Sequence, residues 1–101
     1  MKFVKYDNKS LINFYSKNGL EFDENKCYFG INVESFALLE NEKIIGTVSI
    51  SIYKEKSFIE ALAVDKEYRN KGYGKLLIEK AIEKLEKPVY TISKVDKFYL
   101  K

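Results

Sequence analysis

The chain has 101 residues, 46% of them hydrophobic and 33% charged, and a net charge of +3. This length suits one domain over residues 1–101, and the composition excludes a disordered chain. The mild positive charge is far below the basic footprint of a dedicated nucleic-acid binder, so we expect no nucleic-acid partner. An RNA- or ribosome-associated role is thereby disfavoured.

Histidine is absent and there is one cysteine, Cys27. A Ser-His-Asp or Cys-His mechanism is therefore excluded, as are an intrachain disulfide and a zinc site of cysteine and histidine ligands. We expect no metal. No apolar run approaches the roughly 18 residues that cross a bilayer. Because the first residues also lack a signal-peptide core, we expect a cytoplasmic protein without membrane contact.

The first part of the chain predicts a strand, a helix and a strand hairpin. Lys2 to Tyr6 is a strand candidate, and Asp7 or Asn8 can cap a helix over residues 9–17. Asn18-Gly19 favours a stop, since both residues tolerate positive φ. Residues 20–32 show no regular pattern. Strands are then predicted over 35–40 and 44–53, joined by a turn.

In the longer strand, alternation predicts two faces. One face carries Ile44, Gly46, Val48, Ile50 and Ile52, and the other carries Ile45, Thr47, Ser49, Ser51 and Tyr53.

The second part predicts a buried strand, a helix and a further strand. Residues 58–64 are apolar on both faces apart from Glu60, which suits a central strand covered on both sides. An apolar stripe at helical spacing begins at Gly74, and Pro88 ends that helix. Residues 89–93 form another strand candidate, and a last helix could start at Asp96. This order of elements indicates a mixed α/β sheet.

The segment between that central strand and the helix carries the chemistry. The first turn of a helix offers unpaired amides and the positive end of the helix dipole, which together form an anion site. Gly72 and Gly74 remove side chains there and permit positive φ. Arg69, the only arginine, and Lys71 add charge at the same point. The structural alternative is a glycine turn before a helix that carries solubilising charges.

Residues 69–74, Arg-Asn-Lys-Gly-Tyr-Gly, resemble the acetyl-CoA motif of the GNAT N-acetyltransferase superfamily. The lead-in at 62–68 also matches that family, and the hairpin at 42–48 is similar to its second and third strands. The resemblance covers essentially the whole chain from Lys2 onward. It implies an α/β (α+β) fold with a mixed, mainly antiparallel sheet flanked by helices and lacking the last two strands.

The resemblance also implies a cosubstrate, acetyl-CoA, and the residues that bind it. The backbone of Leu62, Ala63 and Val64 would bond to the pantetheine arm like an added strand. The thioester would lie where the strands 58–64 and 89–93 splay apart. The pyrophosphate would lie at the amides of Asn70, Lys71, Gly72, Tyr73, Gly74 and Lys75, beside Arg69.

Two residues are candidates for proton transfer to and from the reactants. Glu60 is the one ionisable side chain in an apolar strand, where burial tunes a carboxylate for use as a general base. Its structural alternative is a position at a strand edge or an ion pair with a lysine. Tyr99, in the pair Phe98-Tyr99, stands where many family members place the tyrosine that protonates the leaving thiolate. Its structural alternative is packing near a frayed terminus.

Typical family members continue past this tyrosine into two more strands, whereas this sequence stops two residues after it. We therefore expect an incomplete acceptor side and an exposed sheet edge at Val89–Ser93, which a second copy of the chain would cover. The leading hypothesis is an N-acetyltransferase that acts on a primary amine. The alternative is a catalytically reduced, acetyl-CoA-binding regulatory module.

Overall fold

The computed structural model of the chain describes residues 1–22, 33–53, 56–85 and 89–91. Within them five strands form one sheet in chain order, with β1 to β4 antiparallel and β5 parallel to β4. The predicted mixed, mainly antiparallel sheet is confirmed. The elements are β1 Lys2–Tyr6, η1 Asn8–Leu11, α1 Ile12–Lys17, β2 Val33–Glu40, β3 Lys43–Tyr53, β4 Lys56–Val64, η3 Lys66–Tyr68, α2 Tyr73–Leu85 and β5 Val89–Thr91.

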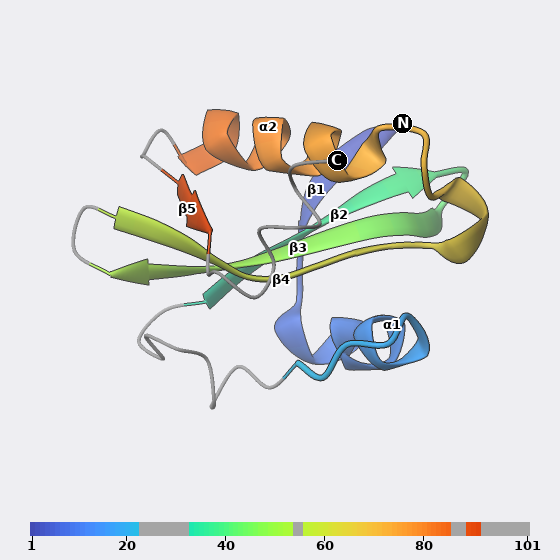
Figure 1. The fold of residues 1–101 in the computed structure, drawn as a ribbon, viewed down its shortest axis with the longest axis horizontal. Helices are drawn as coiled ribbons and strands as arrows, with labels where there is room; N and C mark the ends of the chain where they lie inside the picture. Colours follow the sequence, from blue (N-terminus) through green and yellow to red (C-terminus); the bar gives the residue numbers. More distant parts are fainter. Residues whose placement is uncertain (23–32, 54–55, 86–88, 92–101) are drawn as a thin grey trace.

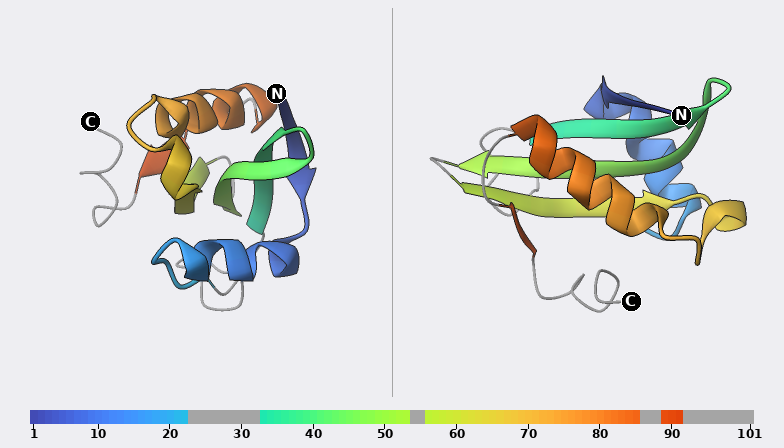
Figure 2. Two further views of the ribbon diagram at one scale, coloured as in Figure 1. Left: turned by 90° about the vertical axis from the view of Figure 1, so that its right-hand side faces the viewer. Right: turned by 90° about the horizontal axis from the view of Figure 1, so that it is seen from above.

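A helix covers each face of the sheet, so the described residues form three layers (Figures 1 and 2). On one face, Leu77 and Ala81 of α2 belong to a core cluster with residues of β2, β3 and β4. On the other face, Tyr15 of α1 shares a second cluster with Ala61 and Ala63 of β4. Both faces of β4 are therefore buried, which explains why its sequence is apolar on both sides.

The N-terminal helical segment begins as a 3-10 turn and continues as α1. The side chain of Asp7 accepts a hydrogen bond from the Ser10 amide at 3.2 Å, which confirms the predicted cap. The helix ends at Lys17 with Asn18 as its C-cap, and Gly19 has φ +84, as the Asn-Gly pair predicts. In the part of the chain that the structure describes, no helix is long and apolar enough to cross a membrane.

A β-bulge in β3 alters the alternation that the sequence predicts. Leu38 pairs with Gly46 and Leu39 pairs with Ile44, so Ile45 is the extra residue. Ile45 joins the cluster beneath α2, whereas Ile44 packs against the cluster beneath α1. A bulge places two successive residues on one side of the sheet. The predicted faces of Ile44 and Ile45 are therefore wrong, because alternation alone does not register an inserted residue.

Candidate active site

The segment between β4 and α2 leaves the first amides of the helix without an acceptor among the residues that the structure describes. The chain turns through Asn70 at φ 62 and Gly72 at φ 85, and the first hydrogen bond of α2 joins Leu76 N to Gly72 O at 3.1 Å. Among the described residues, no acceptor takes the amide hydrogens of residues 72–75. Together with the positive end of the α2 dipole, these amides have the chemistry of an anion site.

The two glycines of this turn do different things. Gly72 adopts a backbone conformation that requires the absence of a Cβ, because its φ of +85 lies in the left-handed region that other residues avoid. A Cβ added to Gly72 would meet no atom within 4 Å. The space beside this turn is therefore open. Gly74 lies in the first turn of α2 and does not have positive φ.

Arg69 joins the turn to two other parts of the fold. Its Nε donates to the Val64 carbonyl oxygen at 3.0 Å, and its Nη2 donates to Asn18 Oδ1 at 3.0 Å. Asn18 in turn donates Nδ2 to the Phe14 carbonyl at 2.8 Å. The guanidinium thus holds the turn to the end of β4 and to the C-terminus of α1. We call this pair of hydrogen bonds the Arg69 clamp.

The clamp leaves most of the guanidinium available. An arginine has five N–H donors, and the clamp uses one on Nε and one on Nη2. The ion pairs formed by the described residues do not include Arg69, so no described carboxylate neutralises its charge. The sequence predicts phosphate recognition by Arg69 but gives no signal for Asn18. No local pattern links these residues, because they lie 51 positions apart.

The surface beside Arg69 is hollowed and carries more positive than negative side chains. The hollow measures about 650 Å³ and lies between the end of α1, the β2–β3 hairpin and the turn before α2. Such a surface favours an anionic ligand. Its lining residues are Lys17, Asn18, Gly19, Lys43, Asp65, Lys66, Glu67 and Arg69.

The tyrosines of the turn pack against protein. The rings of Tyr68 and Tyr73 meet edge to face with centroids 5.9 Å apart, and both rings contact the cluster beneath α2. The Nζ atoms of Lys43 and Lys71 lie 5.5 and 5.8 Å from the centroid of the Tyr68 ring. The Tyr73 ring therefore packs against the core, while its amide belongs to the row at residues 72–75 that has no described acceptor. Lys75 is the last residue of the predicted site, and its Nζ lies 3.9 Å from Glu79 Oε1 in the same helix.

The residues predicted to meet the pantetheine arm lie in the second half of β4. Leu62, Ala63 and Val64 are all buried. The described part of β5 pairs with Ser57, Phe58 and Ile59, and the described residues add no strand on that side of residues 60–64. The backbone of this half of β4 is thus a sheet edge within the described structure. One carbonyl of this edge already has a hydrogen-bond partner, because the Val64 oxygen accepts from Arg69 Nε.

Glu60 occupies a second β-bulge, in β4. Ser49 pairs with Ala61 and Ile50 pairs with Ile59, which leaves Glu60 as the extra residue. Strict alternation would place Glu60 on the face of Leu62, beneath α2. The bulge instead turns it to the α1 face, where the Ser51 hydroxyl donates to Glu60 Oε1 at 2.6 Å.

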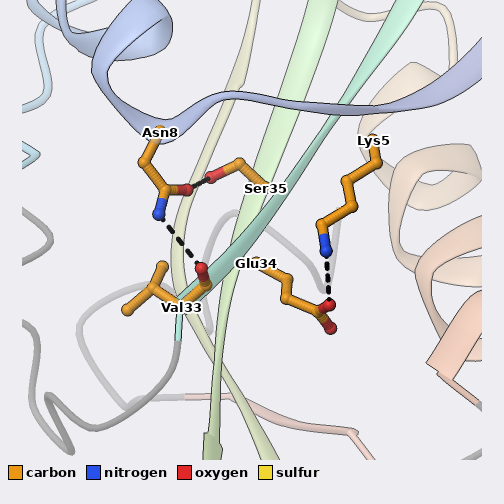
Figure 3. Close-up of polar contacts among 5 residues, drawn as sticks. All are labelled: Lys5, Asn8, Val33, Glu34 and Ser35. Carbon is orange, nitrogen blue, oxygen red and sulfur yellow. Dashed lines mark hydrogen bonds and ion pairs between the residues drawn. The ribbon is translucent and has the colours of Figure 1, made fainter.

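A chain of buried hydroxyls runs beside Glu60 on the α1 face. Tyr15 Oη lies 2.8 Å from Ser49 Oγ, which lies 2.6 Å from Ser35 Oγ. Ser35 donates to Asn8 Oδ1, and Asn8 Nδ2 donates to the Val33 carbonyl (Figure 3). Because each hydroxyl has one hydrogen, Ser49 must donate to Ser35 and Tyr15 to Ser49, which leaves the longer contact of Tyr15 Oη with the Ala61 carbonyl, at 3.5 Å, as a secondary one. The chain therefore has one direction, toward Asn8.

Tyr99 and residues 92–93 of the predicted edge strand lie outside the described residues. The structure places the turn directly after β4 and Glu60 in the bulge of the same strand, and it adds the contacts of Asn18 with Arg69 and of Ser51 with Glu60.

Comparison with known proteins agrees with this architecture. The sequence model of the acetyltransferase (GNAT) family matches residues 20–98. The chain belongs to this family, and acetyl transfer is the chemistry of the family in general. A search of curated proteins finds no match.

Solved structures share the fold at low identity. A probable acetyltransferase of unknown function from methicillin-resistant Staphylococcus aureus has 19% identity and a TM-score of 0.68, over 98% of this chain and 85% of that one. A soil-metagenome aminoglycoside acetyltransferase has 21% identity and a TM-score of 0.64, over 98% and 82%. The ribosomal-protein-S18-alanine N-acetyltransferase of Escherichia coli has 20% identity and a TM-score of 0.66, over 84% of this chain and 59% of the enzyme. Our chain therefore spans about three fifths of the E. coli enzyme's length.

Proposed function

We propose that this chain transfers an acetyl group from acetyl-CoA to a primary amine by direct attack. The observation that carries the proposal is the row of amides at residues 72–75 that no described acceptor fills, beside the charge of Arg69. A diphosphate fits this chemistry because its oxygens accept from several amides at once and its charge meets the helix dipole. Family membership supports acetyl transfer in general, and the amine acceptor belongs to the proposal.

In this proposal β4 aligns the thioester arm. The amides and carbonyls at the edge of Leu62 and Ala63 bond to pantetheine, which lies beside β4 as an added strand would. The diphosphate at the turn and the arm along β4 then fix the thioester at two points. This arrangement converts the reaction with a bound amine into an effectively unimolecular step.

Glu60 acts as the general base. A primary amine is protonated near neutral pH, so Glu60 takes a proton from it through a water molecule. The neutral nitrogen attacks the thioester carbonyl carbon, the C–N bond forms and the C–S bond breaks. Tyr99 gives a proton to the departing CoA thiolate, and the second proton that the nitrogen loses restores the Tyr99 hydroxyl. The products are the acetylated amine and CoA.

We also propose a homodimer through the edge at residues 89–93. β5 is short and pairs with β4 on one side only within the described structure, and such an edge favours pairing with another chain. Sedimentation at micromolar concentration tests this proposal. A dimer is expected, and a strictly monomeric species would contradict it.

The cosubstrate site is tested first by thermal unfolding. Acetyl-CoA at ~100 times its Kd adds about 2.7 kcal/mol to the free energy of unfolding, which raises the Tm of a domain of this size by roughly 10 °C or more. S-acetylpantetheine lacks the diphosphate and is expected to give a much smaller shift. Lys71→Ala should weaken acetyl-CoA binding, whereas Lys84→Ala, at the far end of α2, should not. Equal shifts with both compounds would contradict a diphosphate site.

Catalysis is tested by thiol release from acetyl-CoA with a panel of amines. Saturable release with at least one primary amine, and acetylation of that amine by mass spectrometry, are expected. Binding of acetyl-CoA with no release against any amine would instead support the catalytically reduced regulatory module.

A further inference from the structure

The hydrogen bond between Ser51 and Glu60 has the geometry of a charge-assisted contact. The Ser51 oxygen lies 2.6 Å from Glu60 Oε1, within the short range typical of a hydroxyl that donates to a carboxylate. Ser51 is 0% exposed, so its hydroxyl cannot exchange this partner for bulk water. Because an ionised carboxylate has no hydrogen to donate, Ser51 is the donor of this bond and Glu60 the acceptor.

Two features of the strands make this contact possible. The bulge at Glu60 turns its side chain to the α1 face, which is the face of Ser51. Ser51 pairs with Phe58 across the β3–β4 ladder, two positions before Glu60. The carboxylate is thus held by a hydroxyl on the neighbouring strand. Its position is set by the ladder that also fixes residues 62–64.

We propose that Ser51 is a positioning residue that aims the Glu60 carboxylate at the acceptor amine. This inference rests on the proposed function, in which Glu60 is the base and β4 aligns the thioester. A glutamate has three rotatable side-chain bonds, and a bond to Oε1 from a buried donor restricts them. Ser51 touches no reactant in this proposal and acts through Glu60.

The test compares kcat and KM in Ser51→Ala, Ser51→Thr and Glu60→Gln. A misplaced base costs rate, so we expect Ser51→Ala to lower kcat by about 10- to 100-fold and to leave the KM for acetyl-CoA unchanged. Ser51→Thr keeps the hydroxyl and should retain most of the wild-type kcat. In a Glu60→Gln background Ser51→Ala should have little further effect on kcat, which a purely structural role would not produce.

Ser49→Ala is the matched control. Ser49 lies two residues away on the same strand and face, is 0% exposed, and bonds to Tyr15 and Ser35 rather than to Glu60. The Ser49→Ala variant loses an equivalent buried hydroxyl, so its stability should fall. At temperatures below the Tm of this variant, its kcat should remain near the wild-type value. An equal fall in kcat for both alanine variants would overturn the positioning role.

A second double-mutant cycle, in urea unfolding, separates this inference from the proposed function. Coupling between Ser51→Ala and Glu60→Ala reports the hydrogen bond without any activity, whereas Glu60→Gln keeps an amide oxygen that can still accept from Ser51. Coupling in both stability and kcat supports the inference. Additive effects in either cycle overturn it while leaving the acetyltransferase proposal standing. Coupling in stability with no transfer by any variant, the wild type included, refutes the proposed function and this inference with it.

Discussion

The Arg69 clamp should be measurable as a coupling energy. Arg69→Ala removes both of its hydrogen bonds, whereas Asn18→Ala removes the acceptor of one of them and also the bond from Asn18 to the Phe14 carbonyl. The losses of stability in the two single variants therefore include different sets of hydrogen bonds. A double-mutant cycle cancels the contribution of Phe14 and isolates the contact between Arg69 and Asn18.

The expected magnitude follows from the kind of bond. A hydrogen bond with one charged partner contributes about 1.5–3 kcal/mol, but this one is exposed, and solvent screening reduces it. We expect a coupling of about 0.5–1.5 kcal/mol in urea unfolding, and a total loss of about 1–3 kcal/mol for Arg69→Ala. Arg69→Lys keeps the charge but cannot reach both acceptors with the geometry of a guanidinium, so it should recover only part of this loss.

The clamp should also affect acetyl-CoA. If it holds the turn in its binding conformation, Asn18→Ala should raise the Kd for acetyl-CoA by up to about tenfold, since 1.4 kcal/mol corresponds to a factor of ten. Calorimetric titration measures this change. Single effects that add within about 0.3 kcal/mol, or an unchanged Kd in Asn18→Ala, would refute the reasoning.

Three substitutions test other parts of the fold by urea unfolding. In Gly46→Ala, the new Cβ would lie 2.8 Å from Leu77 Cδ1 and 3.4 Å from the Ala63 carbonyl oxygen, so we expect the free energy of unfolding to fall by about 1–3 kcal/mol. No loss would mean that the Leu77 side chain can shift away without cost. Gly72→Ala should lower the free energy of unfolding by about 1–2 kcal/mol because φ is positive at this position. Gly72→Asn should lower it less. Equal losses would indicate steric contacts of the new side chain instead. Tyr15→Phe removes the hydroxyl that bonds to Ser49 and should lower the free energy of unfolding by about 1 kcal/mol. An unchanged stability would contradict a contribution of this hydroxyl to folding.

Local patterns predicted much of this fold. The cap at Asp7, the stop at Asn18-Gly19 and the apolar stripe of α2 depend on neighbours within one or two turns of helix, so the sequence alone was enough. The turn before α2 was predicted in the same way, because Gly72 and the start of a helix are close in sequence.

The differences between the predicted and the observed structure come from contacts between segments that are distant in the sequence. A bulge depends on how two strands pair, and the alternation of one strand does not contain that information. For this reason Ile45 and Glu60 lie on faces that alternation does not predict. The partner of Arg69 was missed for the same reason, since Asn18 belongs to another element. Ser51 was placed on the correct face of β3, but its contact with Glu60 required the bulge in β4.

The most direct measurement of the diphosphate site is a titration of the nitrogen-15-labelled chain with acetyl-CoA, followed amide by amide by NMR. The amides of residues 72–75 should shift most and with a common saturation curve, and S-acetylpantetheine should leave them almost unmoved. If these four amides do not respond while acetyl-CoA binds elsewhere, or if no amide shows saturable change, the helix start does not hold the nucleotide and the proposed acetyl transfer loses its physical basis.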